Sequence, residues 1–173
     1  TFGSFIGFAA AFPLLIKHSF PEINALQFAF LGPFVGALMR PLGGWIADKA
    51  GGARVTFWNF GLMIATVFGV IYFLPHGQSA GNFYGFLAMF MLLFITTGIG
   101  NGSTFRMIPV IFRTVHEGLS AGKDANAKEL AVKAAGKESA AVLGFTSAIG
   151  AFGAFFIPKS FGSSIALTGG PEA

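Results

Sequence analysis

Five long apolar segments, separated by short polar gaps, limit the fold of this 173-residue chain more than any other feature. A helix needs about 20 mostly apolar residues to cross the hydrocarbon core of a bilayer, and the segments approach or exceed that length. Hydrophobic residues make up 54% of the chain and charged residues only 10%, whereas soluble domains carry about 25% charge. Such a chain cannot cover a water-facing surface. We therefore predict an all-α fold of polytopic membrane helices.

The apolar pattern predicts where these helices lie. We expect transmembrane helices over residues 1–16, 25–47, 55–74, 83–112 and 139–157, and a solvated cytoplasmic linker helix over the alanine-rich residues 113–138. The first segment has no initiator methionine, and the Gly/Ser/Pro tail after residue 157 has no cluster of charges. We therefore expect the chain to be a section of a longer membrane protein.

Loop charges predict the orientation, because cytoplasmic loops carry an excess of Lys and Arg. The loops after the first and third segments contain only Lys17. The loops after the second and fourth segments contain Lys49, Arg54, Arg113, Lys123, Lys128, Lys133 and Lys137. The second group of loops is therefore expected to face the cytoplasm.

Several classes of function are excluded by residue type and placement. The chain has no cysteine, and its three histidines fall in or beside loops, so we expect neither a metal site nor a cofactor. Its basic residues lie in short gaps and form no patch for nucleic acid. Gly100-Asn101-Gly102 lacks the strand and the lysine of a phosphate loop. No Asp, Glu or His lies deep in a span, so no carboxylate proton relay is visible, and we do not expect an enzyme.

Arg40 is the residue most indicative of function, because it lies well inside the second segment, about 12 Å of helix from its cytoplasmic end. An arginine at such a depth is energetically costly and usually functional. It shares a ridge of four-residue spacing with Gly32, Gly36 and Gly44. We interpret its guanidinium as a ligand for an anion, in particular a planar oxyanion. The alternative is an arginine that reaches to the cytoplasmic headgroups, helped by Pro41.

Small residues in the fifth segment suggest a second group that could contact the ligand. Ser147 lies three residues from both Gly144 and Gly150, so its hydroxyl shares their face and could donate to a ligand. A hydroxyl that bonds back to its own helix is equally consistent with this spacing. For the glycines, including those at 98, 100 and 102, plain helix packing is the simpler interpretation.

Two further groups have plainer interpretations. Arg106 lies near the cytoplasmic end of the fourth segment, where reaching to headgroups or pairing in a loop is expected. The phenylalanines of the first segment follow helical spacing, which is typical of lipid contact or core packing, and lining a pathway is the less favoured interpretation. They are Phe2, Phe5, Phe8 and Phe12.

Four stretches carry a resemblance to known families. Residues 44–54, GWIADKAGGAR, resemble the G-x-x-x-D-(R/K)-x-G loop motif of the major facilitator superfamily, which follows the second and eighth helices on the cytoplasmic side. Residues 1–8, 102–105 and 143–162 resemble the nitrate/nitrite porter family within it. The likeness extends over nearly the whole chain.

This resemblance implies a twelve-helix fold in two halves, with residues 1–173 forming part of the C-terminal six-helix half, as family helices seven to eleven. In the family, one arginine from helix two and one from helix eight hold the planar anion between aromatic rings, and the two halves rock around it. Arg40 matches the helix-eight arginine and Phe2 matches a site aromatic. Gly144 and Ser147 fall in the helix-eleven signature. The helix-two arginine would belong to an N-terminal half outside this sequence.

The sequence therefore predicts secondary active transport of nitrate and nitrite across the bacterial inner membrane, by nitrate/nitrite antiport or by nitrate/proton symport. The expected partners are these two anions, the lipid bilayer and the N-terminal half of the transporter. Two alternatives stay open: a facilitator for another small anion, and a membrane module that senses an anion without transporting it.

Overall fold

The computed structural model describes residues 2–75 and 81–168, and all regular secondary structure within these two ranges is helical. Five stretches of the described chain are long and apolar enough to cross a membrane. The prediction of an all-α fold with five membrane spans is thus confirmed. The helices are α1 (Phe2–Ser19), α2 (Ala25–Phe28), α3 (Leu31–Ala50), α4 (Gly52–Phe73), α5 (Phe83–Leu119), α6 (Ala125–Ala151) and α7 (Gly153–Thr168).

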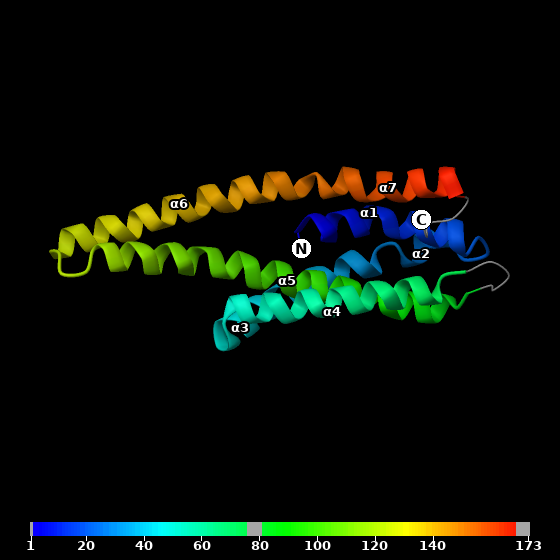
Figure 1. Cartoon of the computed structure of the whole chain (residues 1–173), viewed down its shortest axis with the longest axis horizontal. Helices are drawn as coiled ribbons and strands as arrows, with labels where there is room; N and C mark the ends of the chain where they lie inside the picture. Colours follow the sequence, from blue (N-terminus) through cyan, green and yellow to red (C-terminus); the bar gives the residue numbers. More distant parts are fainter. Residues whose placement is uncertain (1, 76–80, 169–173) are drawn as a thin grey trace.

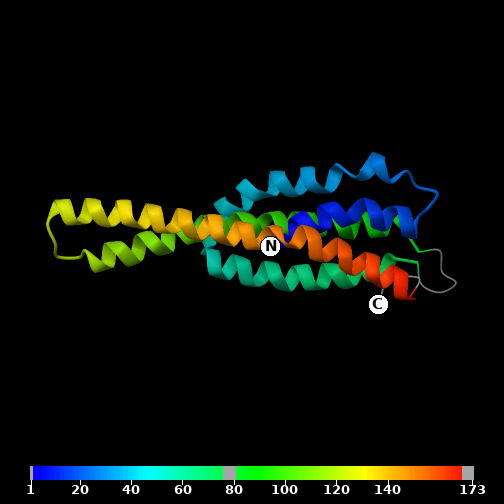
Figure 2. The same cartoon turned by 90° about the horizontal axis from the view of Figure 1, so that it is seen from above.

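The helices run nearly parallel to one long axis, as Figures 1 and 2 show from two sides. α3 and α4 both pack against α5, and α1 contacts α5 on one side and α6 and α7 on the other. The α3–α4 turn and the α5–α6 turn lie toward the same end, where α5 and α6 project well beyond the other helices (Figure 1). α1 therefore lies between α5 and the α6–α7 stretch, and α5 and α6 also contact each other directly.

The second predicted span, residues 25–47, consists of two helices in the structure. α2 ends at Phe28, and α3 begins at Leu31. Pro33 lies in the first turn of α3, and a proline ring clashes with the carbonyl group four residues earlier, which here belongs to Ala29. A continuous helix through this point is therefore disfavoured, and α3 starts afresh. α3 then continues to Ala50, three residues beyond the predicted end.

Residues 113–138, expected as one linking helix, are divided between two helices. α5 continues to Leu119, a short turn follows, and α6 begins at Ala125. Gly122 adopts a positive φ of 80° in the turn, which a glycine tolerates best. The Asp124 side chain then accepts a hydrogen bond from the backbone N–H of Ala127 at 3.2 Å and so caps α6. The two helix ends form a hairpin, which we call the projecting hairpin (residues 107–140).

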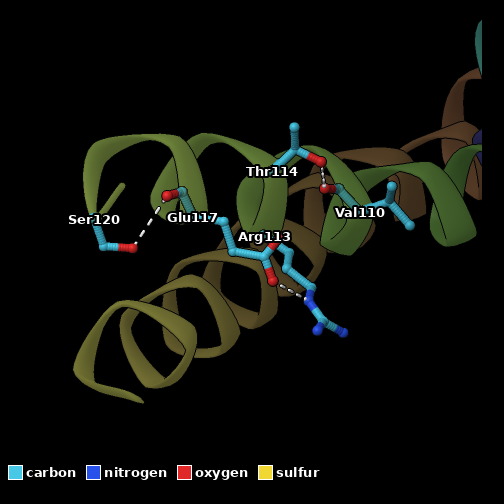
Figure 3. A network of polar contacts seen from close by, with 5 residues as sticks. All are labelled: Val110, Arg113, Thr114, Glu117 and Ser120. Carbon is cyan, nitrogen blue, oxygen red and sulfur yellow. Dashed lines mark hydrogen bonds and ion pairs between the residues drawn. The ribbon is translucent and has the colours of Figure 1, made fainter. Parts of the chain in front are cut away.

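Local polar contacts stabilise the end of α5, as Figure 3 shows. Arg113 Nε donates to Glu117 Oε1 at 2.7 Å, one turn further along the helix. The Thr114 hydroxyl donates to the carbonyl of Val110, and the Ser120 hydroxyl donates to the carbonyl of Glu117. Across the hairpin, the His116 imidazole contacts Glu138 Oε2 at 2.9 Å. These polar contacts stabilise the part of α5 that extends beyond its apolar segment.

The fifth predicted span, residues 139–157, lies within a longer helical stretch. α6 and α7 are interrupted only around Phe152, and α7 continues through Pro158 to Thr168. The predicted Gly/Ser/Pro tail is therefore helical over residues 158–168, and residues 169–173 lie outside the described residues. Prolines are tolerated within membrane helices because neighbouring helices and polar side chains satisfy the freed backbone groups.

Phenylalanine rings at the contact of α1 with α5 form most of the core. Phe12 of α1 stacks on Phe90 of α5 with 4.7 Å between ring centroids, and Phe86 and Phe94 pack beside them. Each such ring buries a large apolar area. The other buried apolar residues of this cluster are Phe5, Leu15, Ile16, Phe20, Val70 and Leu74. By contrast, α4 exposes many large apolar side chains, including Phe57, Trp58 and Phe68. An apolar exposed face of this kind suits contact with lipid chains.

Candidate anion site

Arg40 is placed by an unusually close contact between the backbones of α3 and α5. Gly98 and Gly102 are one turn apart on α5 and face α3. A Cβ atom on Gly98 would overlap the carbonyl oxygen of Gly36, and one on Gly102 would overlap the carbonyl oxygen of Arg40 itself. Only glycine fits at these two points. The close contact between the backbones of α3 and α5 thus sets the position of Arg40 in the bundle.

After Arg40, the α3 glycine in close contact with α5 is Gly43, not the Gly44 expected from the four-residue ridge. Gly32 and Gly36 are buried against α5, as a packing ridge requires. Gly43 is the next close contact, where an added Cβ would overlap the carbonyl oxygen of Ile99, whereas Gly44 has its nearest neighbour at 3.8 Å. Four residues of helix turn through about 400°, so a ridge with that spacing drifts away from a straight partner. Further along α3, the residue in close contact with α5 is therefore Gly43 and not Gly44.

The guanidinium of Arg40 lies over two aromatic rings of α1. Its Cζ atom is 4.4 Å from the ring centroid of Phe5 and 5.9 Å from that of Phe2. The residue is half-buried, and its Nε atom is buried without a hydrogen-bond acceptor among residues 2–75 and 81–168. No ion pair within those ranges involves Arg40. Among the described residues, the contacts recorded for its positive charge are the cation–π contacts with these two rings.

The two rings are themselves positioned from several sides. Phe5 is buried and meets Phe94 of α5 edge-on, with 6.0 Å between centroids. Phe2 contacts Phe105 of α5 at 5.9 Å, and its ring lies beside Gly150 of α6, where an added Cβ would come within 2.9 Å of it. The structure thus brings Arg40 and Phe2 together, as the family resemblance implied. Phe5 was missed because it shares its helical spacing with the other phenylalanines of α1.

Gly144 and Ser147 lie on α6 and have no described contact with Arg40 or Phe2. Gly144 is exposed, and nothing within the described chain lies within 4 Å of a Cβ built on it. The Ser147 hydroxyl donates to the carbonyl of Leu143 at 2.6 Å. That is the bond back to its own helix that its spacing also allowed. Ser147 lies one turn before Gly150, so it is on the side of α6 that meets Phe2.

Arg106 pairs with Asp48, the aspartate of the loop motif at residues 44–54. Its Nε donates to both carboxylate oxygens of Asp48, at 2.8 and 3.1 Å. Loop pairing was one of the two roles expected for this residue. Both side chains are largely exposed, at 61% and 45%, so their attraction is weakened by solvent. The ion pair joins the end of α3 to α5 and leaves Arg40 as the arginine that faces α1.

This arrangement suits a small, flat anion. The guanidinium presents a rigid planar fork of N–H donors, which matches two oxygens of a planar anion better than an ammonium does. Aromatic rings beside such a pair exclude water without competing for the donors. Low local polarity strengthens the attraction between arginine and anion. The site consists of one guanidinium, which supplies both the positive charge and the planar fork of donors, and two aromatic rings.

Comparisons with known proteins match this chain to transporters. No family model matches it. It is 52% identical over 174 residues to the nitrate/nitrite transporter NarU of Salmonella typhimurium, covering 99% of this chain and 37% of that protein. NarU of Escherichia coli is also 52% identical, over 175 residues with the same coverage. A probable nitrate/nitrite antiporter, NarK2 of Thermus thermophilus, is 33% identical over 98% of this chain and 34% of its own length. The chain thus spans little more than a third of these relatives.

Proposed function

Because the chain belongs to the nitrate/nitrite transporter family, we propose that it forms part of a secondary active transporter that moves nitrate and nitrite by alternating access. It is a multi-pass membrane protein with helical spans. Helical spans favour the bacterial cytoplasmic membrane, since proteins of the outer membrane cross it as β-barrels. In this proposal Arg40 and Phe2 bind the anion, with Phe5 beside them, and Gly144 and Ser147 border the pathway.

The observation that carries the proposal is the unpaired charge of Arg40. Its guanidinium rests on Phe5 and Phe2, and its buried Nε has no acceptor within the described chain. A buried charge without a partner is costly, and it persists where a ligand supplies the partner. Nitrate is planar and spreads one negative charge over three oxygens. Two of these oxygens can accept from the guanidinium fork while the rings cover the flat faces.

The distribution of acidic groups bears on how transport is coupled. The described carboxylates lie at helix ends, in loops or on the projecting hairpin, as Asp48, Glu22 and Glu138 illustrate. Exchange of nitrate for nitrite keeps an anion beside Arg40 at every stage and requires no proton-carrying carboxylate. Symport with protons requires a titratable group in the rest of the transporter. The N-terminal half is proposed to supply a second arginine, which would close the site over the anion.

Flux measurements on the complete transporter test the proposal. Proteoliposomes loaded with nitrite are expected to take up labelled nitrate in exchange, and a proton gradient imposed without internal nitrite tests symport. Arg40→Lys keeps the charge and loses the fork, so it is expected to reduce nitrate uptake at least tenfold. Arg113→Lys is the matched control, because Arg113 is exposed and pairs with Glu117 on the projecting hairpin. It is expected to transport as the unsubstituted protein does.

Three outcomes would contradict the proposal in different ways. Nitrate binding without flux would assign the site to anion sensing. Flux of another small anion that nitrate does not inhibit would change the substrate. Full nitrate transport by Arg40→Lys would show that the guanidinium of Arg40 is not required to bind the anion.

A further inference from the structure

Asn101 is a buried polar residue that the proposed anion site does not yet use. It lies on α5 between Phe94, seven residues before it, and Phe105, four residues after it, so the three share one face. Phe94 contacts Phe5, and Phe105 contacts Phe2. The face is thus directed at the two rings of α1 that hold the guanidinium. Asn101 is only 4% exposed.

The backbone contacts place Asn101 at the level of Arg40. A Cβ added to Gly102, the next residue on α5, would overlap the carbonyl oxygen of Arg40, and one added to Gly98, one turn earlier, would overlap that of Gly36. Consecutive Cα atoms are 3.8 Å apart. The backbone of Asn101 therefore lies one residue from a very close contact between α3 and α5. By helical spacing its side chain shares the face of Phe94 and Phe105, whose rings contact those of α1.

An unpaired acceptor and an unpaired donor thus occur in the same three-helix junction. Among the described residues, Asn101 Oδ1 is buried without a donor, and Arg40 Nε is buried without an acceptor. Leaving either atom unpaired costs about 1–3 kcal/mol, which makes an arrangement that pairs them favourable. Several side-chain torsions precede Nε in arginine, so this pair can form by rotamer change while α3 and α5 stay packed.

We propose that Asn101 is a positioning residue for Arg40: its Oδ1 accepts the hydrogen bond of Nε–H in the anion-bound transporter. This inference rests on the proposed function of Arg40. With Nε held, the two terminal nitrogens of the guanidinium turn together toward the anion, and the plane of the fork is fixed. Asn101 thereby contributes to anion affinity without touching the anion.

Transport kinetics of the complete transporter test this role. Asn101→Leu replaces the amide by an apolar group of similar shape that suits the surrounding phenylalanines. It is expected to raise the KM for nitrate about tenfold, the effect of one hydrogen bond to a charged group, and to leave the maximal rate and the Tm close to those of the unsubstituted protein. Asn59→Leu is the matched control. Asn59 is also buried, but it donates to the carbonyl of Thr96 at 2.9 Å on the α4 side of α5, so its loss is expected to lower the Tm and leave KM unchanged.

A double substitution separates positioning from direct binding. If Asn101 acts through Arg40 Nε, adding Asn101→Leu to Arg40→Lys is expected to weaken nitrate binding no further, because lysine has no such N–H. An equal loss in both backgrounds would overturn the proposal, since Asn101 would then act on the anion directly. An unchanged KM in Asn101→Leu, in a transporter that still carries nitrate, would also overturn it and leave the proposed function intact.

A spectroscopic measurement needs no substitution at Asn101. In the complete transporter labelled with ¹⁵N-arginine, the Arg40 Nε–H signal is identified by its loss in Arg40→Lys. With nitrate bound, its exchange with solvent is expected to be at least tenfold slower than that of the exposed Arg113 Nε–H. Equal exchange rates for the two would show that Nε is not held, and would overturn the proposal.

Discussion

The middle of α5 and its C-terminal end are stabilised by different kinds of contact. Over residues 94–105, α5 meets α3 with glycines against carbonyl oxygens, and Thr56 and Asn59 of α4 bond to it from the other side. Over residues 110–119 it projects with α6 and is held by exposed ion pairs, caps and turns. The first region tolerates almost no added atom, whereas the second has open space around its glycines. The comparison teaches that the position of Arg40 depends on backbone contact, whereas the hairpin depends on many weak, replaceable contacts.

The sharpest test of this comparison places the same substitution in the middle of α5 and at its C-terminal end. Gly102→Ala puts a Cβ into the carbonyl of Arg40, so the two helices must separate or bend, at a cost of about 1–3 kcal/mol. Nitrate transport by the complete protein is expected to fall by roughly tenfold or more. Gly118→Ala, with nothing within 4 Å, is expected to transport normally and to stabilise its helix by up to about 1 kcal/mol. Equal effects of the two changes would break the comparison.

The next effect concerns the ring beneath the guanidinium. Phe5→Leu keeps an apolar side chain in the α1–α5 core but removes the π-face 4.4 Å from Arg40. Cation–π contacts contribute about 0.5–1 kcal/mol at exposed sites and about 2 kcal/mol away from water, so the KM for nitrate is expected to rise roughly two- to thirtyfold. Uptake kinetics measure this. Phe57→Leu, at an exposed position on α4, serves as the control and should leave KM unaltered.

On the projecting hairpin, the corresponding test removes a helix cap. Asp124→Ala deletes the acceptor for the Ala127 N–H and is expected to destabilise the start of α6 by about 1 kcal/mol. Faster amide hydrogen exchange over residues 125–130 would report the loss. Nitrate uptake is expected to remain unchanged. A matching loss of uptake would mean that the hairpin and the anion site are coupled more tightly than the comparison allows.

The smallest expected effect belongs to the exposed ion pair between the two regions. Asp48→Asn leaves Arg106 without its carboxylate partner, but both side chains are solvated, so the free energy of unfolding is expected to fall only slightly. Thermal denaturation in low and high salt measures it. The difference between Asp48→Asn and the unsubstituted protein should shrink as salt screens the pair. A large difference that salt does not change would contradict this account.

Much of the fold followed from the sequence, because apolar length alone determines which segments can span a membrane. The pattern could not locate the break at residues 29–30 or the turn at 120–124, since both depend on single residues within a long helical pattern. The signals were present: Pro33 disfavours a continuous helix, and Gly122 followed by Asp124 is typical of one helix ending and another beginning.

For the candidate site, the sequence could indicate residues but not their neighbours. The depth of Arg40 was readable from its position in an apolar run, and Phe2 came from the family resemblance. Phe5 and Asn101 were not selected, because periodicity shows that residues share a face but not which helix that face meets. Only the packed helices show that α1, α3 and α5 converge at the guanidinium.

The contact of Gly102 with the Arg40 carbonyl has a mechanical consequence. Two helices in contact backbone to backbone are expected to turn as one lever, with its pivot near Arg40 and its free arm in the projecting hairpin. From Gly102 to Leu119 that arm measures about 25 Å along the helix axis. A tilt of about 10° at the pivot would therefore sweep the tip through about 4 Å, so a motion too slight to resolve around the guanidinium becomes readable at the far end of α5.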